Sequence, residues 1–268
     1  MHKISRIKES KRKNGRYHIY LEKDEGEEYT GTVSEDTLIK LNLLRAREIT
    51  EEEYESIRSM EVIDQGVHAA INYISYRMRS RHEVFSHLKG KDFEDEVIEE
   101  VMERIDQLNL LNDLEFAEAF IRTKRDTTGK GPRVIRQELY QKGVDESVID
   151  QAMQEFPDEQ ILDNAIALIE KKAAQFNKES QRKQEQKLMQ FMMAKGFPTD
   201  IIKEAMDMAD VGQSDDDEWE SMVHQGEKLL RRHTDANGKV DRNKLKNALF
   251  RKGFPFDLIQ RFMDEYTD

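Results

Sequence analysis

The sequence predicts a mainly α-helical protein made of tandem three-helix-bundle repeats, four units in an elongated and curved arrangement, with a small β-containing module at the N-terminus. Three observations lead to this prediction: one apolar pattern recurs four times, a β-hairpin signal stands near the N-terminus, and the 268 residues include only 4 prolines and 13 glycines. Hydrophobic and charged residues each make up 37% of the chain. That composition is polar for a single globule and favours small units with much surface.

Charge and composition exclude several classes of protein. The formal net charge of −12 excludes a uniformly basic nucleic-acid binder but is compatible with a segregated basic face. Without cysteine, the chain cannot form disulfides, cysteine-ligated metal centres or a cysteine nucleophile. No apolar run approaches the roughly 20 residues of a membrane span, and the basic N-terminus lacks the apolar stretch of a secretory signal. We therefore expect a cytoplasmic protein without membrane contact.

The first 60 residues have the pattern of a small β-containing module. Strands are expected at about residues 3–11, 16–22 and 29–33. In the second of these, Tyr17–Leu21 shows the alternation of a half-buried strand. The Asn14–Gly15 pair before it favours the positive φ angles of a type I′ turn, the strongest local signal for a hairpin.

Two helix starts follow inside this module. Ser34 can cap a short helix that contains Leu38, Ile39 and Leu41. Residues 50–53, Thr-Glu-Glu-Glu, form a capping-box pattern that opens another helix.

Basic residues cover the first strand and the turn after it. They are opposed only by Glu9 and comprise Lys3, Arg6, Lys8, Lys11, Arg12, Lys13 and Arg16. One interpretation is contact with a phosphate backbone or an acidic partner. The other is an edge strand that Lys and Arg protect from aggregation. The sequence favours neither.

A repeated pattern occupies the rest of the chain. Each copy begins at an apolar anchor, followed by Lys at +3, Gly at +4 in three copies, an apolar residue at +5 and further apolar residues at +9, +10 and +14. The anchors are Leu88, Leu139, Met192 and Leu249, at separations of 51, 53 and 57 residues. Seven matched positions in four copies indicate tandem structural units.

Each copy predicts a helix that ends at Lys-Gly and a further helix after a short turn. Gly supplies the left-handed conformation at the helix end, and Lys lies favourably against the negative end of the helix dipole. Asp92 replaces Gly in the first copy, so we expect that turn to differ. Another helix precedes each anchor, marked by a small residue with two large apolar residues at +3 and +4. The small residues are Ala70, Ala117, Ala165 and Gly226.

These signals divide the chain into five segments. The predicted bounds are 1–60 for the module and 61–112, 113–158, 159–212 and 213–268 for the four three-helix repeats. Asp210–Glu218, rich in Gly, Ser and acidic residues, is predicted to link the third and fourth repeats.

Charge alternates with the same period. The net charge is +4 over residues 69–91, +5 over 122–142, +5 over 171–195 and +7 over 228–252; between these it is −6 over 94–106, −6 over 145–159 and −8 over 200–220. First and second helices are therefore basic, and third helices and linkers are acidic. Matching to helix dipoles explains part of this pattern, but a basic face for a polyanion or protein partner explains it better.

Two motifs resemble metal sites, but their spacing or residue types do not fit such sites. His82 and His87 are five residues apart, so on a helix their rings point about 140° apart and cannot share a metal. His233–Gly238 resembles the start of a calcium loop, but His occupies the first position and Lys244 the twelfth. We predict no catalytic residues, no metal, no cofactor and no enzyme activity.

The chain resembles the RecX family of bacterial recombination regulators along nearly its whole length. The resemblance rests on the tandem three-helix units, on the Leu-x-x-Lys-Gly-[Phe/Val] turns and on the junction from Leu108 to Ala117. Tyr17–Leu21 and Val33–Leu38 match the N-terminal module of longer members, whereas Asp92 departs from the Gly of the turn.

This resemblance implies a non-enzymatic regulator that binds the RecA recombinase, in homologous recombination, DNA repair and the SOS response. Members lie in the helical groove of the RecA–single-stranded-DNA filament and mostly limit its ATPase and strand exchange; many also bind DNA directly. We expect a monomer. The charge pattern together with the resemblance gives these candidate contacts with RecA or DNA: Arg77, Arg79, Arg81, Arg122, Lys124, Arg125, Arg133, Arg136, Lys171, Lys172, Arg231 and Arg232.

Two alternatives remain. The protein could bind single- or double-stranded DNA directly through its basic face, with effects on RecA secondary. It could also be a helical-repeat scaffold for another protein.

Overall fold

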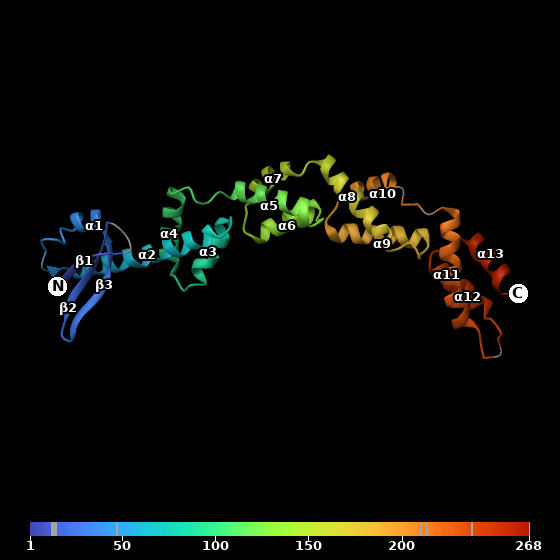
Figure 1. The fold of residues 1–268 in the computed structure, drawn as a ribbon, viewed down its shortest axis with the longest axis horizontal. Helices are drawn as coiled ribbons and strands as arrows, with labels where there is room; N and C mark the ends of the chain where they lie inside the picture. The colour runs from blue at the N-terminus through green and yellow to red at the C-terminus, as the bar shows by residue number, and fades with distance from the viewer. Residues whose placement is uncertain (12–14, 47, 210, 213, 237, 268) are drawn as a thin grey trace. The chain divides into compact units, whose positions relative to one another are not determined.

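The computed structural model of the chain describes residues 1–11, 15–46, 48–209, 211–212, 214–236 and 238–267. These residues form thirteen α-helices, one 3-10 helix and four strands (Figure 1). The chain divides into two compact units, Met1–Phe116 and Ala117–Asp268. This composition confirms a mainly helical protein with a small N-terminal sheet.

An antiparallel sheet in the order β3-β2-β1-β4 forms the N-terminal module. The strands are β1 (His2–Glu9), β2 (Arg16–Lys23), β3 (Gly26–Ser34) and β4 (Glu48–Ile49). The three longer strands confirm those expected from the sequence; β4, which pairs with β1, is too short to give a signal. Ile19, Leu21 and Val33 are buried on one face of the sheet. Of the predicted type I′ turn, Gly15 has a φ of 72°, while Asn14 lies outside the described residues, as do Arg12 and Lys13 of the basic stretch.

Both helix starts in the module are confirmed. Ser34 caps α1 (Glu35–Lys40), since its side chain accepts a hydrogen bond from the backbone N–H of Thr37. Thr50 caps α2 (Glu51–Ser75) through a complete capping box. These caps satisfy N–H groups that have no partner inside the helix.

The long helix α2 serves both the sheet and the first bundle. Ile57, in its first half, is buried in the core beside the sheet. Gly66, in its second half, lies against α4, and a Cβ added there would be 2.6 Å from Val101 Cγ2. The helix therefore continues across residue 60, where the sequence pattern places the edge of the module.

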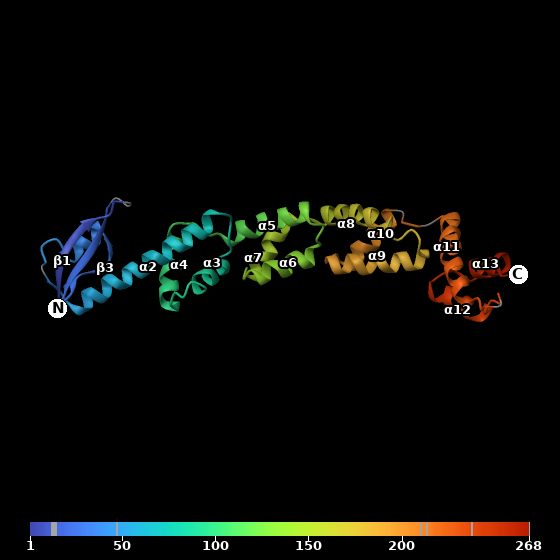
Figure 2. The ribbon, with the colours of Figure 1, turned by 60° about the horizontal axis from the view of Figure 1, so that its bottom comes forward.

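The helices from α2 onward form successive groups of three. The bounds of the others are α3 (Arg81–Lys89) and α4 (Asp95–Gln107); α5 (Asp113–Thr127), α6 (Pro132–Gln141) and α7 (Glu146–Ala152) with the 3-10 helix η1 (Met153–Glu155); α8 (Asp158–Ala173), α9 (Gln181–Lys195) and α10 (Thr199–Met208); and α11 (Asp215–His233), α12 (Arg242–Arg251) and α13 (Phe256–Tyr266). Figure 2 shows α8, α9 and α10 packed together, as their mutual contacts require. The predicted anchors are buried at the centre of each group.

The turn after each second helix contains a residue of positive φ at the same position in all four repeats. The residue at +4 from the anchor has a positive φ in each: Asp92 at 63°, Gly143 at 72°, Gly196 at 92° and Gly253 at 91°. In the first copy the backbone N–H of Phe93 donates to the carbonyl of Leu88, as the N–H of Val144 donates to that of Leu139. The expectation that Asp92 changes the turn was therefore wrong. A short polar side chain adopts the left-handed conformation more readily than most residues do.

The small residue of each first helix permits close packing. Gly226 of α11 faces the Phe262 ring of α13, and an added Cβ would lie 2.4 Å from that ring. The predicted linker is shorter than expected: Ser214 caps α11, so Asp215–Glu218 forms its first turn. The acidic residues there oppose the positive end of the helix dipole, which explains why an acidic stretch forms helix. Asp210 and Gln213 lie outside the described residues.

Candidate functional site

The predicted contact residues lie on first and second helices or in the loops that join them. Arg77 and Arg79 lie between α2 and α3, Arg81 begins α3, Arg122, Lys124 and Arg125 lie on α5, Arg133 and Arg136 on α6, Lys171 and Lys172 on α8, and Arg231 and Arg232 on α11. The structure thus distributes them over all four repeats, and side-chain contacts separate them into groups.

In the first repeat, ion pairs hold two candidate arginines. Arg77 Nη2 lies 3.2 Å from Glu83 Oε1. The guanidinium of Arg81 pairs with Asp106 of the acidic helix α4, and the backbone N–H of Arg81 donates to Asp113. The hydrogen bond to Asp106 raises the pKa of Arg81. Arg81 therefore keeps its charge and fixes the start of α3.

In the second repeat, Arg125 holds the end of the bundle together through contacts within the repeat. Its Nη1 donates to the carbonyl oxygen of Glu155 at 2.5 Å, and its Nε lies 2.6 Å from Asp126 Oδ1. Only 16% of the Arg125 side chain is exposed. Arg122, one turn earlier, pairs with the Glu155 carboxylate at 3.1 Å but is much more exposed. Arg125 closes the end of the bundle, whereas Arg122 remains accessible.

Basic side chains of neighbouring helices form further ion pairs with the acidic third helices. Arg136 of α6 pairs with Asp150 of α7, and Lys89 at the end of α3 lies 2.9 Å from Asp95 of α4. Part of the predicted charge alternation therefore acts within the first two repeats. Exposed pairs of this kind contribute only about 0–1 kcal/mol each, so a carboxylate or phosphate of a partner can replace the internal acid.

Four candidate cations point into solvent. Arg133, Lys171, Arg231 and Arg232 are exposed. None of their side chains has an ion-pair or hydrogen-bond partner among the residues that the structure describes. These four can accept a partner without first giving up an internal contact.

A cation covers an aromatic ring in the first repeat. The guanidinium of Arg79 lies 3.8 Å from the centroid of Tyr73. The Tyr73 ring also stacks on His87, with centroids 3.9 Å apart and an angle of 4° between planes. Burial, and then Lys91 and Arg79, lower the pKa of His87. Burial and the two neighbouring cations therefore favour the neutral imidazole.

The same combination recurs between first and second helices of the next two repeats. Lys124 and Lys142 lie 5.1 and 5.7 Å from the centroid of Phe120. Lys172 and Lys195 lie 4.9 and 5.6 Å from the centroid of Phe191. In these two repeats the lysine three residues after the anchor thus adds to an aromatic and cationic surface, besides its favourable position at the helix end.

One acid lies inside this surface. Glu138 accepts hydrogen bonds from Lys130, and its other carboxylate oxygen lies 3.6 Å from Lys124. Burial alone would raise the pKa of Glu138, but Lys130 and Lys124 together lower it. The carboxylate is ionised and orients two lysines on α5 and the loop before α6.

Sequence reasoning missed three exposed apolar side chains beside the cations. Tyr140, Met193 and Phe250 each follow the anchor by one residue and are 72%, 52% and 62% exposed. A large apolar residue at an equivalent exposed position in three repeats is a typical partner contact. The signal was present in the sequence, because this column of the repeat is apolar in all copies but the first, which has Lys89.

The motifs set aside from the sequence have other roles. His87 stacks on Tyr73, and His82 lies 3.4 Å from the Ser86 hydroxyl. In the calcium-like loop, Asp235 accepts a hydrogen bond from the backbone N–H of Lys239, while Asn237 lies outside the described residues. Over the described ranges, the structure has no group of three or more acidic or histidine side chains that could hold a metal ion. No helix in that part of the chain is long and apolar enough to cross a bilayer.

The four repeats match models of known three-helix domains. Residues 68–104 match the first three-helix domain of RecX, and residues 112–153 match the second. The third three-helix domain of RecX matches twice, at residues 158–206 and 215–263. The last two repeats are therefore copies of one domain type.

Curated proteins and solved structures are similar over most of the chain. A regulatory protein RecX of Halalkalibacterium halodurans is 38% identical over 263 residues, 98% of this chain and 99% of that protein. One of Bacillus cytotoxicus is 36% identical over 97% of this chain and 96% of that protein. A crystal structure of a regulatory protein RecX has a TM-score of 0.67 and 32% identity over 77% of this chain and its own entire length. That of RecX from Lactobacillus salivarius has a TM-score of 0.54 and 33% identity over 57% of this chain and 99% of its own.

Proposed function

The chain belongs to the RecX family, and from this premise we propose that it is a non-enzymatic regulator of homologous recombination and DNA repair that binds the RecA–single-stranded-DNA filament. In this proposal the protein acts in the cytoplasm without a cofactor and mostly inhibits the ATPase and strand-exchange activities of RecA. The curated relatives are named regulatory proteins, which points to a role without catalysis.

One observation carries the proposal: in each of the first three repeats, cations cover an aromatic ring of the first or second helix. Tyr73, Phe120 and Phe191 each lie beneath one or two cations. A filament presents the same subunit surface at regular intervals, so a protein that repeats its contact surface can engage several subunits. Each bound repeat makes the next contact intramolecular, which raises affinity without a new kind of contact.

We propose the twelve basic residues as the contacts of this surface, in three groups. Arg133, Lys171, Arg231 and Arg232 are free to bind; Arg79, Lys124 and Lys172 lie over aromatic rings; and Arg77, Arg81, Arg122, Arg125 and Arg136 exchange or share an internal ion pair. The exposed members carry the contact, and Arg125 supports it by closing its bundle. The elongated, curved arrangement of the repeats stays a prediction.

The test is RecA-dependent ATP hydrolysis on single-stranded DNA, titrated with variants of the full chain. Charge reversal by Arg122→Glu and Lys124→Glu together should raise the concentration for half-inhibition by about tenfold, since each lost charge contact also becomes repulsive. Arg125 is left unchanged because its loss would disturb folding. Lys203→Glu, an exposed lysine on α10 of the third repeat, is the matched control and should leave potency unchanged. Equal potency of the double variant and the control would refute the proposed surface.

Direct DNA binding is the second candidate, favoured by the four exposed cations without side-chain partners in the described residues. Free guanidinium and ammonium groups are the usual ligands of phosphates. Affinity for single- or double-stranded DNA would then fall steeply with salt concentration. Absence of any binding at low salt would eliminate this candidate.

A further inference from the structure

The sheet of the N-terminal module has two unlike faces. One face is packed on its core and includes Ile19 and Leu21. The other face presents polar and aromatic side chains in two rows that cross β1, β2 and β3. The first row is Arg6, Tyr20 and Tyr29, and the second is Lys8, His18 and Thr32.

The aromatic rings on this face lie close together. The Tyr29 centroid is 5.7 Å from that of Tyr20 and 5.8 Å from that of His18, both edge to face. The guanidinium of Arg6 lies 4.5 Å from the Tyr20 centroid. Tyr29 is 45% exposed, so that solvent reaches part of its side chain.

Internal hydrogen bonds fix this arrangement. The Tyr29 hydroxyl lies 2.7 Å from Thr32 Oγ1 and donates to Glu61 of α2 at 3.2 Å. Glu61 also accepts the backbone N–H of Thr32 at 2.6 Å. His18 Nδ1 lies 2.7 Å from the same Thr32 hydroxyl. The aromatic face is therefore rigid before any ligand binds, which reduces the entropy lost on binding.

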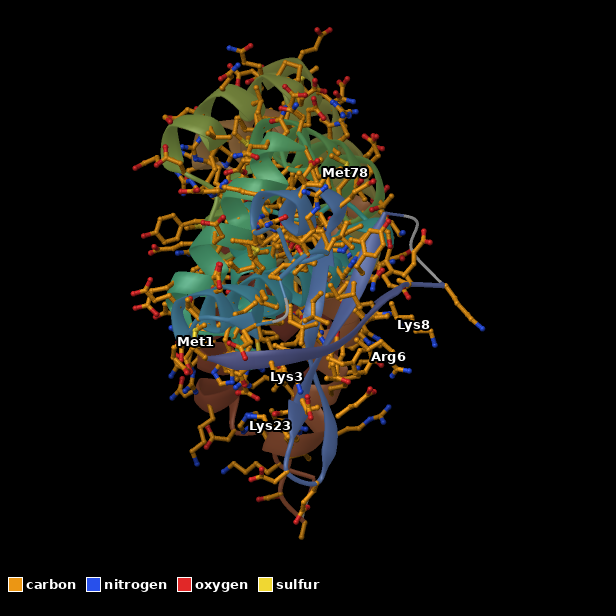
Figure 3. The ribbon with its side chains drawn as sticks, turned by 90° about the vertical axis from the view of Figure 1, so that its left-hand side faces the viewer. Met1, Lys3, Arg6, Lys8, Lys23 and Met78 are labelled. Atoms are coloured by element: carbon orange, nitrogen blue, oxygen red, sulfur yellow. The ribbon has the colours of Figure 1, made fainter. Side chains whose placement is uncertain are left out.

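A cavity of about 520 Å³ opens beside these rings, between the sheet and α2. Its basic residues include Lys8, Lys11 and Arg16, and its acids are mostly engaged. Asp64 is paired with both Arg16 and Arg104. Glu61 accepts hydrogen bonds from the Tyr29 hydroxyl and from the backbone N–H of Thr32. The described residues offer no ion-pair partner to Lys8 or Lys11. In Figure 3, Arg6 and Lys8 lie next to each other along β1, apart from Lys23.

We propose that this face binds single-stranded nucleic acid, with a base stacked on Tyr29 and phosphates held by Lys8, Lys11 and Arg6. Exposed aromatic rings that lie beside cations on a sheet are suited to this ligand, because every base has a π-face and every nucleotide carries a phosphate. An acidic peptide would use the cations but would not need the rings. The site is separate from the surface of the repeats and stands whether or not the chain acts on RecA.

The test measures binding of the full chain to fluorescent single-stranded oligonucleotides, oligo-dT and oligo-U, by anisotropy. Because stacking and phosphate contacts both contribute, Tyr29→Ala and Lys8→Glu should each weaken binding about fivefold to a hundredfold. Tyr29→Phe keeps the ring and should retain affinity, so it separates stacking from loss of the hydroxyl. Tyr76→Ala and Lys23→Glu remove an exposed tyrosine and a lysine elsewhere and should have no effect.

Two further measurements place the ligand. An oligonucleotide of the same length without bases should bind at least about fivefold more weakly than oligo-dT, since it cannot stack. Photocrosslinking with 5-iodouracil should modify Tyr20 or Tyr29. Equal binding of the abasic strand, or crosslinks confined to residues outside the module, would overturn the proposal. If the sheet face does not bind nucleic acid, the proposed inhibition of RecA by the full chain is unaffected. The outcome for this site is therefore distinguishable from the outcome for the proposed function.

Discussion

The backbone N–H of Gly131 donates a hydrogen bond of 2.8 Å to the carbonyl oxygen of Lys195, so that the start of α6 meets the end of α9 in the next repeat. The N–H of Arg133 likewise donates to the carbonyl of Gly196. The first N–H groups and the last C=O groups of a helix lack partners within it, and here each set satisfies the other. The Lys-Gly turn therefore joins successive repeats as well as ending a helix.

We expect Gly131→Ala to weaken this junction. An added Cβ would lie 2.5 Å from the backbone carbon of Gly196, too close for any side chain to fit without movement. Because the neighbour is backbone, the strain should cost about 1–3 kcal/mol and lower the midpoint of thermal unfolding by several degrees. Gly212→Ala, with nothing within 4 Å of the added Cβ, is the control. Equal unfolding midpoints of the two variants would contradict this account.

Ser180→Ala should destabilise the next junction. The Ser180 side chain caps α9 by accepting the N–H of Lys183, and its hydroxyl donates to the carbonyl of Lys252 at 2.7 Å. The loss of a cap together with an unsatisfied buried carbonyl should cost about 2–3 kcal/mol. Ser214→Ala removes a cap without such a link and should cost about 1 kcal/mol. Urea unfolding of both variants measures the difference, and no excess loss for Ser180→Ala would argue against the link.

Stability of the first repeat should fall in mild acid because of His87. Its folded-state pKa is lowered from the ordinary 6.5 by burial, with Lys91 and Arg79 adding to the effect. As pH falls below 6.5, the unfolded chain takes up this proton before the folded chain does, so stability decreases; above 6.5 the contribution is complete. His87→Phe keeps the stack on Tyr73 but cannot titrate. Unfolding midpoints at about pH 7.5 and about pH 5.5 should therefore differ less for the variant than for the parent chain. An equal difference in the two proteins would show that His87 does not cause the loss of stability in acid.

The exposed apolar side chains should matter for the partner but not for the fold. The triple variant Tyr140→Ser, Met193→Ser and Phe250→Ser removes all three. Exposed substitutions change stability by only about 0.5 kcal/mol each, whereas loss of an apolar interface anchor costs more than about 1 kcal/mol. If the chain inhibits RecA as proposed, the concentration for half-inhibition should thus rise at least about tenfold. Tyr76→Ser removes an 84% exposed tyrosine that does not follow a repeat anchor, and this variant should retain full potency. Full potency of the triple variant would exclude these side chains from the contact.

Local patterns predicted most of the fold. Ser34 and Thr50 start helices because their side chains satisfy nearby N–H groups, which short-range sequence fully specifies. The repeat turns follow from one residue with positive φ after each anchor, and Asp92 shows that the position matters more than the glycine itself. The start of α11 was missed because an acidic stretch can be a linker as well as a first helical turn.

The candidate site was less predictable, because exposure depends on residues distant in sequence. Arg125 and Arg133 are both arginines of the second repeat, yet Arg125 is fixed by Glu155 and Arg133 is exposed. The contact of Gly131 with Lys195 and the cation–ring pairs involving Phe191 likewise depend on how helices pack. A charge count identifies the basic helices but cannot separate cations that stabilise a bundle from those that face a partner.

The most direct test of the central claim is the rate of RecA-dependent ATP hydrolysis on single-stranded DNA, titrated with the full chain. If the chain binds the filament, the rate of hydrolysis should fall progressively as the chain is added. It should reach a plateau while the chain is still present at fewer copies than RecA subunits. A rate that stays constant up to a molar excess of the chain over RecA would contradict the claim.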